Sequence, residues 1–143
     1  MFRLDDAMPF NANRVAILFR RELIRCFRDY GISPEQWQVL ATLWLKNSLT
    51  QVEIMEITLQ DAPATSKMIA KMAERDLVTV TPAADDKRKK IVTLTKKSKK
   101  LQNILPQKLV AHFEKLFENF AENKQKELLS LLQDLRRALG DLQ

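Results

Sequence analysis

The chain has 143 residues, of which 45% are hydrophobic and 29% charged, and its formal net charge is +6. This length and composition suit one globular domain with a single compact core and exclude two such cores. No apolar run approaches the roughly 20 residues that span a bilayer, and the first residues lack the basic-then-apolar pattern of a signal peptide. We therefore expect a cytoplasmic protein with no membrane partner, and its single cysteine excludes an intramolecular disulfide.

The first predicted helix runs from about Ala12 to Tyr30, and Gly31 is expected to end it in a left-handed conformation. One face of this helix is apolar and contains Val15, Leu18, Phe19, Leu23, Cys26, Phe27 and Tyr30. The next helix begins at Ser33-Pro34, with Gln36 in the capping-box position. Its predicted buried stripe contains Trp37, Leu40, Ala41 and Trp44. This spacing favours core packing over base stacking for both tryptophans.

Two short helices are predicted to follow. Thr50 and Glu53 form a capping box, and Asp61 caps the second helix, which has Pro63 in its first turn. Four residues of the second helix form one apolar stripe: Thr65, Met68, Ile69 and Met72. Its opposite face is small and basic, and includes Pro63, Ala64, Ser66, Lys67 and Lys71. Such a face can enter a DNA major groove, although an ordinary surface helix would look similar.

A basic β-hairpin comes next. Valines alternate with threonines in residues 78–81, and residues 91–94 form a matching β-branched run, which predicts two strands around a loop from Pro82 to Lys90. Eight of the 24 basic and two of the 18 acidic side chains lie between residues 85 and 100, so this segment holds the whole net charge. Charge gathered beside a candidate recognition helix indicates a surface that binds nucleic acid, rather than a solvated face. The hairpin residues predicted to contact DNA include Lys87, Arg88, Lys89 and Lys90.

The rest of the chain is predicted to form two helices. Apolar residues with helical spacing run from Leu101 to Phe120, and a second series runs from Leu128 to Leu139 after the polar stretch from Ala121 to Lys126. Pro106 should bend the first of these helices, because it removes the hydrogen bond to the carbonyl of Gln102. These apolar faces exceed what a small domain covers, so we expect a second copy of the chain to cover them. Packing of these helices on the chain's own domain as a monomer stays open.

The order of these elements resembles the MarR family of winged-helix transcription regulators. The segments that carry the resemblance are SPEQWQVL at 33–40, LTQ at 49–51, RDLV at 75–78, DKR at 86–88 and VTLT at 92–95. The resemblance implies a mainly α fold with a small β-wing, and a homodimer that binds double-stranded DNA. It also implies that the helix from Asp61 to Arg75 enters the major groove, and that Arg88, steadied by Asp86, reaches the minor groove.

The domain organisation expected from the resemblance is a single regulator domain over residues 1–143. Its DNA-binding winged helix would cover residues 33–100, and its dimerisation helices residues 1–32 and 101–143. The chain has Asp76 and Ser98 where the family commonly has glycine. Aspartate tolerates a left-handed backbone, so the turn at Asp76 should form, whereas no consequence follows for Ser98.

Members of this family often bind small aromatic or anionic effectors between the dimerisation helices and the DNA-binding lobe. In this chain the resemblance places Phe19, Trp37, Leu40, Leu105 and His112 around such a pocket. Some relatives sense oxidants through a cysteine near the start of the first helix. Cys26 lies near the predicted end of that helix on its apolar face, so a buried structural thiol is the favoured interpretation.

The sequence contains little that supports catalysis or metal binding. His112 is the only histidine and lies on an apolar stripe, and two glycines provide no phosphate-binding loop. One histidine and one cysteine cannot fill a transition-metal site by themselves. We therefore expect no enzyme, no cofactor and no metal, but a sequence-specific, ligand-responsive repressor that binds a palindromic operator. The alternative is a winged-helix architectural or protein-interaction module that binds DNA without sequence preference.

Overall fold

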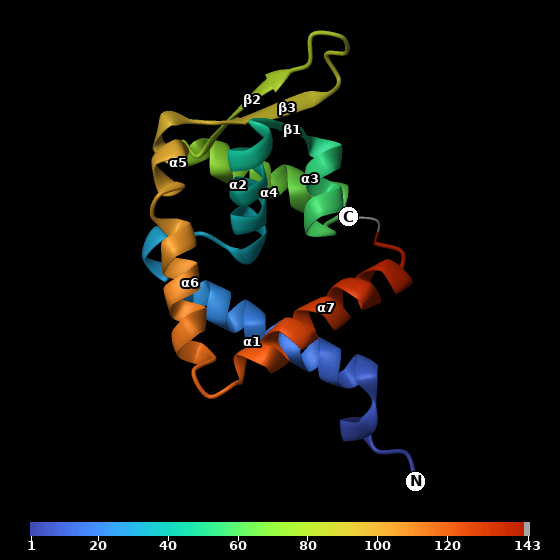
Figure 1. The fold of residues 1–143 in the computed structure, drawn as a ribbon. Coiled ribbons are helices and arrows are strands. Elements are labelled where there is room, and N and C mark those ends of the chain that lie inside the picture. The colour runs from blue at the N-terminus through green and yellow to red at the C-terminus, as the bar shows by residue number, and fades with distance from the viewer. Residues whose placement is uncertain (142–143) are drawn as a thin grey trace. The chain divides into compact units, whose positions relative to one another are not determined.

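The computed structural model describes residues 1–141 (Figure 1). The chain divides into two compact units, the first covering Met1–Leu109 and the second beginning at Val110. The fold is mainly helical with one small antiparallel sheet, so the predicted fold class is confirmed. Within the described residues no helix is both long and apolar enough to cross a membrane.

The first unit begins with a short 3-10 turn, η1 (Leu4–Asp6), the long helix α1 (Met8–Cys26) and a second 3-10 turn, η2 (Arg28–Tyr30). Helix α1 starts earlier than predicted, because its N-cap, Ala7, supplies no capping side chain that would mark the boundary in the sequence. Gly31 has φ of +60°, which confirms the left-handed end predicted at this position.

Helix α2 (Pro34–Lys46) has the predicted capping box: the Gln36 amide donates to the Ser33 hydroxyl at 3.1 Å, and the Ser33 amide donates to the Gln36 side chain. Its buried stripe differs from the prediction, since Val39, Leu40 and Leu43 are fully buried while Ala41 and both tryptophans are only half-buried. Trp37 packs between Phe27 and Trp44, at centroid distances of 4.9 and 5.7 Å. Both half-buried tryptophans therefore pack against the core, which agrees with the prediction of core packing.

The helix-turn-helix consists of α3 (Gln51–Thr58) and α4 (Ala62–Glu74). The side chains of Thr50 and Asp61 cap these helices by accepting hydrogen bonds from the Glu53 and Ala64 amides, as predicted. Between the helices Leu59 has φ of +55°, a left-handed conformation that is unusual for leucine. The predicted apolar stripe of α4 is confirmed, because Thr65, Met68, Ile69 and Met72 are all buried.

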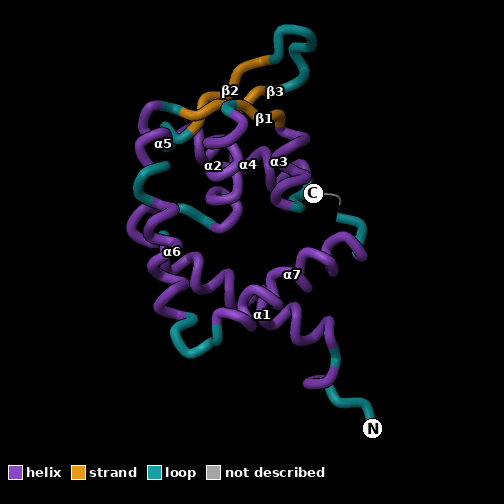
Figure 2. The backbone as a smooth tube through the Cα atoms, in the orientation of Figure 1, coloured by secondary structure: helices purple, strands orange, loops and turns teal. Residues whose placement is uncertain are grey.

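The sheet contains β1 (Ser48–Thr50), β2 (Val78–Pro82) and β3 (Lys90–Leu94) in the order β1-β3-β2 (Figure 2). Both hairpin strands were predicted, but each extends one residue into the expected loop, where Pro82 pairs with Lys90. Proline fits there because β2 is an edge strand. Strand β1 was not predicted, because three residues are too short to show an alternating pattern.

Three helices follow the sheet: α5 (Lys96–Leu101), α6 (Leu105–Leu116) and α7 (Glu122–Ala138). The prediction of one continuous helix from Leu101 to Phe120 was wrong, because the chain leaves the helix after Leu101. Pro106 is the second residue of α6, so it begins a new helix instead of bending an existing one. The polar stretch predicted to separate the last two helices lies mostly inside α7, which starts at Glu122.

The core of the first unit joins α2, α3, α4 and the sheet. Its fully buried side chains include Phe27, Leu40, Leu43, Leu49, Ile54, Met72, Leu77, Val92 and Leu105. This core fixes α4 and the β2–β3 hairpin relative to one another, since both belong to the same unit. In contrast, no residue of α7 is buried within the described chain.

Candidate nucleic-acid interface

The outer face of α4 is fully available to a ligand. Its apolar stripe holds one side of the helix against the core, so the opposite side projects outwards. All the α4 residues predicted to enter a major groove are exposed: Pro63, Ala64, Ser66, Lys67 and Lys71. In the described structure neither lysine of this set forms an ion pair, and both ammonium groups remain available to an anion.

A cleft of about 660 Å³ opens where the wing meets the starts of α3 and α4. The residues that line it are Thr50, Gln51, Val52, Met55, Ala62, Ser66, Arg88, Lys89 and Lys90. The cleft thus joins one predicted α4 residue, Ser66, to three predicted wing cations. Its other residues are small, apolar or amide-bearing. The remaining predicted contacts on α4, together with Asp86 and Lys87, lie outside this cleft.

Asp86 holds the base of the Arg88 side chain. Its carboxylate accepts hydrogen bonds from the Arg88 backbone amide at 3.0 Å and from Nε at 3.2 Å. Both hydrogen bonds lower the pKa of Asp86, and the bond from the backbone amide has the larger effect. The carboxylate is therefore ionised at neutral pH. The Arg88 side chain is still 93% exposed. The guanidinium is therefore oriented at its base while its far end faces solvent.

The other acidic residue of the wing tip also faces a cation. Asp85 and Lys89 form an exposed ion pair with 3.8 Å between oxygen and nitrogen. The two carboxylates of this loop therefore each lie beside one cation. In the described structure Lys87 and Lys90 form no such pair.

Arg75, which the sequence reasoning did not assign to the site, anchors the end of α4. Its guanidinium donates to the backbone carbonyls of Tyr30 and Gly31, the latter at 2.6 Å. The carbonyl of Arg75 in turn accepts a hydrogen bond from Lys97 Nζ at 2.9 Å. These contacts fix the C-terminal end of α4 against η2 and α5. They join residues far apart in the sequence, so no local pattern could have indicated them.

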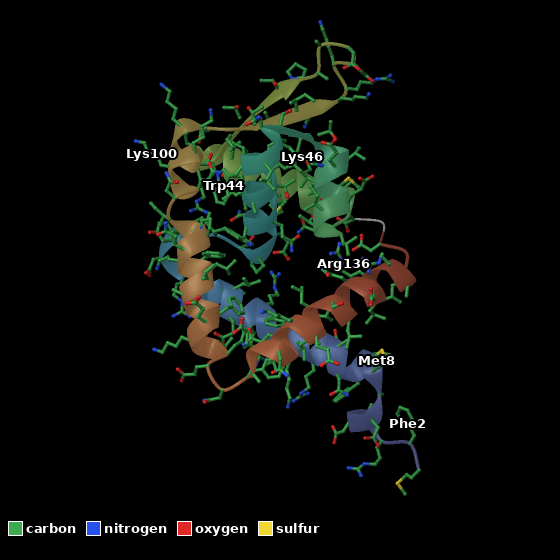
Figure 3. The ribbon with its side chains drawn as sticks, in the orientation of Figure 1. Phe2, Met8, Trp44, Lys46, Lys100 and Arg136 are labelled. Carbon is green, nitrogen blue, oxygen red and sulfur yellow. The ribbon has the colours of Figure 1, made fainter. Side chains whose placement is uncertain are left out.

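Ser98 has a structural role that the sequence left open. It is fully buried and forms a reciprocal capping box with Thr95, whose amide donates to the Ser98 hydroxyl at 3.0 Å. Trp44 Nε1 donates to the Ser98 carbonyl at 3.1 Å, and Figure 3 shows Trp44 between α2 and α5. The Thr95 hydroxyl donates to the carbonyl of Asp76, which has the expected left-handed conformation with φ of +57°. The start of α5 is thus held by several buried polar contacts.

The residues proposed to line an effector pocket have different surroundings. Leu40 and Leu105 are fully buried in the hydrophobic core, so they present no surface to a ligand in this structure. Phe19 and Trp37 are half-buried in the first unit. His112 is half-buried in the second unit, where its ring centroid lies 5.5 Å from that of Phe113.

Cys26 is buried in the core, and desolvation by burial raises the pKa of its thiol, although the charge of Lys108 acts in the opposite direction. The thiol is therefore protonated and poorly reactive at neutral pH, which agrees with a structural role. Among the described residues, no group of three or more histidine, cysteine or acidic side chains is arranged to hold a metal ion.

Comparison with known proteins gives one consistent picture. Residues 30–89 match the model of the MarR family. The uncharacterized HTH-type transcriptional regulator YwoH of Bacillus subtilis (strain 168) is 29% identical over 110 residues, which cover 77% of this chain and 80% of YwoH. The transcriptional repressor CouR of Rhodococcus jostii RHA1, solved with a 23-mer DNA duplex, has a TM-score of 0.85 at 22% identity, covering 92% of this chain and 94% of CouR.

A further solved relative is BpsR of Bordetella bronchiseptica, a protein whose DNA binding is regulated by 6-hydroxynicotinic acid. It has a TM-score of 0.83 at 18% identity, and the match covers 94% of this chain and 96% of BpsR. At these identities the solved structures establish a shared fold. The helix-turn-helix, the wing and the flanking helices thus have counterparts in both relatives.

Proposed function

Since the chain belongs to the MarR family of DNA-binding, winged-helix transcriptional regulators, we propose that it is a homodimeric repressor that recognises a palindromic operator and responds to an effector. The observation that carries this proposal is the cleft between α4 and the wing. It combines a small, exposed helix face with Arg88, Lys89 and Lys90, as a groove-reading helix flanked by phosphate contacts requires.

The proposed division of roles follows from the chemistry of each surface. Small residues at Pro63, Ala64 and Ser66 allow close approach of α4 to base edges. Lys67 and Lys71 reach bases or phosphates from the same face. On the wing, Lys87, Lys89 and Lys90 contact phosphates. Arg88, oriented by Asp86, enters the minor groove, which is narrow and strongly negative over A·T-rich sequence.

The dimer is proposed from apolar surface that each unit leaves exposed. In the first unit, α1 exposes Val15, Ile17 and Leu18. In the second unit, α7 exposes Leu128, Leu129, Leu131 and Leu132. We assign residues 1–32 and 101–143 to dimerisation and residues 33–100 to DNA binding. Two copies would place two recognition helices about one DNA turn apart, which matches a palindrome and combines two weak contacts.

Effector control is proposed as a shift between two conformations of the dimer. One conformation binds DNA strongly and the other binds it weakly. A ligand that prefers the weakly binding conformation lowers the affinity for DNA, and the size of this effect equals the difference in ligand binding free energy between the two conformations, typically about 1–3 kcal/mol. The regulation of BpsR by a small aromatic acid supports this class of effector. Titration of a pre-formed protein–DNA complex with small aromatic carboxylates should release the DNA, with a midpoint that depends on the compound.

Competition binding tests sequence specificity. At fixed salt, a palindrome from the promoter of the chain's own gene or a neighbour should compete at least about a thousand times better than random duplex of equal length. The reason is that α4 would meet matching base edges only in the palindrome. Equal competition by both duplexes would instead favour the architectural module.

Sedimentation equilibrium tests the dimer. Leu132→Glu places a charge on the apolar side of α7 and should dissociate the dimer and weaken operator binding. Ser130→Glu adds the same charge on the opposite side of this helix, and it should leave the dimer intact. A monomeric wild-type protein, or equal behaviour of the two variants, would contradict the proposed interface.

A further inference from the structure

The charge excess is divided unequally between the wing and α5. The wing tip holds four cations, but Asp85 pairs with Lys89 and Asp86 with Arg88. Helix α5 holds four lysines within six residues and no acidic residue. Most of the uncompensated positive charge between residues 85 and 100 therefore lies on α5, outside the cleft at the wing.

Three of the α5 lysines share one face. At 3.6 residues per turn, Lys96, Lys99 and Lys100 fall within an arc of about 100°. All three are exposed, and in the described part of the chain none of them has a carboxylate partner. The carbonyl of the neighbouring Asp76 binds Thr95, but the Asp76 carboxylate forms no ion pair with these lysines. Figure 3 shows Lys100 extending outwards from α5, away from Trp44.

Lys97 differs from these three lysines, because its ammonium group caps the C-terminal end of α4 through the carbonyl of Arg75. That contact locates α5 at the end of α4. The cleft lined by Ala62, Ser66 and the wing cations lies at the other end of α4. Thus α4, about 20 Å long for 13 residues, has cations beyond both of its ends.

The distance between the two groups of cations also suits a duplex. Lys90 is the first residue of strand β3, which is five residues long, and Lys96 follows two residues after its end. At about 3.3 Å per residue the strand spans roughly 17 Å, or about five base-pair steps at 3.4 Å each. The hairpin loop and α5 lie at opposite ends of this strand (Figure 1). A duplex that lies along α4 would therefore place phosphates near both groups of cations.

The lysines of this face do not stabilise the helix that carries them. Like charges three and four residues apart repel one another. Cations in the first turn also oppose the helix dipole, and Lys96 occupies that turn. The helix is nevertheless held firmly by Ser98, Thr95 and Trp44. A rigid element that presents unfavourable like charges to solvent is the arrangement expected for binding a polyanion.

We propose that Lys96, Lys99 and Lys100 form a second phosphate-binding surface, which contacts the DNA backbone at the end of α4 opposite to the wing. The inference rests on the proposed DNA-binding function and extends its contact surface. These contacts are to phosphates only, so they contribute to affinity and to salt dependence, but not to the choice of bases.

The test compares two charge-matched double variants of the full-length protein. One carries Lys99→Gln and Lys100→Gln on α5, and the other carries Lys115→Gln and Lys126→Gln in the second unit. Binding to the preferred duplex and to random duplex is measured over a range of salt concentrations. For the α5 variant, the slope of log K against log salt should fall by about 1.8 for both duplexes, or about 0.9 per phosphate contact. The control variant should keep the wild-type slope. A variant with Lys99→Arg and Lys100→Arg, which retains both charges on α5, should also have the wild-type slope.

The failures of the two proposals can be told apart. A wild-type protein that binds no duplex would overturn the DNA-binding function itself. A wild-type protein that binds, but whose slope is the same in the α5 variant and the control, would overturn only the second surface. Equal slopes are expected if the α5 lysines only face solvent, and also if they bind an acidic protein instead of DNA.

Discussion

At the scale of single residues, Asp86 is where two electrostatic effects oppose each other. Removing its negative charge makes the wing more cationic, which alone would strengthen DNA binding. Removing it also releases Arg88 from the hydrogen bonds that orient it. Because ordering a long side chain upon binding is costly, we expect Asp86→Ala to weaken DNA binding roughly threefold to tenfold.

Asp85→Ala is the matched control, since it removes the same charge from a looser pair with Lys89. It should leave DNA affinity unchanged or raise it, as measured by fluorescence anisotropy. Tighter binding by both variants would show that Asp86 does not orient Arg88. The lowered pKa of Asp86 adds a pH expectation. Its effect should be constant between about pH 6 and 8, and should disappear only as the pH falls through the lowered pKa.

A substitution at Leu59 tests whether the backbone between the two helices of the helix-turn-helix is strained. It is left-handed with φ of +55°, and its side chain is 83% exposed, so it incurs conformational strain with little packing in return. Leu59→Gly should therefore raise the free energy of unfolding, by up to about 1 kcal/mol. Leu45, which is equally exposed but lies within α2, is the control. Leu45→Gly should lower the free energy of unfolding by about 1 kcal/mol. Urea unfolding that shows both variants destabilised alike would refute the strain at Leu59.

At the scale of elements, Ser98 decides how firmly α5 is held. Its hydroxyl accepts a hydrogen bond from the Thr95 amide and donates one to the Thr95 carbonyl, and all these groups are buried. Ser98→Ala removes both bonds and leaves the Thr95 amide only a long bond to the Leu77 carbonyl, at 3.4 Å, which should cost about 1 kcal/mol in urea unfolding. Ser130→Ala, on the exposed face of α7, should change stability by less than about 0.5 kcal/mol. Equal effects of the two changes would remove the structural role assigned to Ser98.

The elements that the sequence predicted correctly are those with local signals. Ser33, Thr50 and Asp61 each cap a helix through a residue three positions away, so the evidence lies within one turn. The periodicity of α4 is equally local. In contrast, α1 begins without a capping side chain, and β1 exists because it pairs with β3 more than 40 residues away. Such boundaries depend on tertiary contacts and leave no local pattern.

The break between α5 and α6 shows a different limit. Apolar residues continue at helical spacing through residues 101–109, because they pack against one core on both sides of the break. Periodicity alone therefore predicted one helix. Pro106 was the available signal, and its frequent occurrence in the first turn of a helix would have suggested the correct start.

The candidate site was predicted in outline. The exposed α4 residues and the wing cations were named from pattern and charge, and the Asp86–Arg88 contact expected from the resemblance is present. Gln51 and Met55 were missed as lining residues, because their nearness to the wing depends on how α3 packs. Arg75 was missed for the same reason, since its carbonyl partners belong to the turn after α1.

At the scale of the whole molecule, the chain separates two kinds of surface chemistry. In the first unit, a group of cations without a carboxylate partner lies on α4, the wing and α5. Exposed leucines lie along α7 in the second unit. A duplex would suit the first surface and a second apolar surface would suit the other. In the proposed dimer, most of the net charge and the apolar contacts of α7 would thus belong to different units.

The most direct measurement compares Lys67→Ala with Lys89→Ala, using the ratio of affinities for the preferred duplex and random duplex. Lys67 lies on the exposed face of α4, so Lys67→Ala should cost about 1–3 kcal/mol on the preferred duplex only and lower the ratio. Lys89 lies on the wing, so Lys89→Ala should weaken both duplexes alike, keep the ratio and reduce the salt slope by about 1. If both variants leave the ratio at the wild-type value, α4 does not read bases, and the proposed function is contradicted.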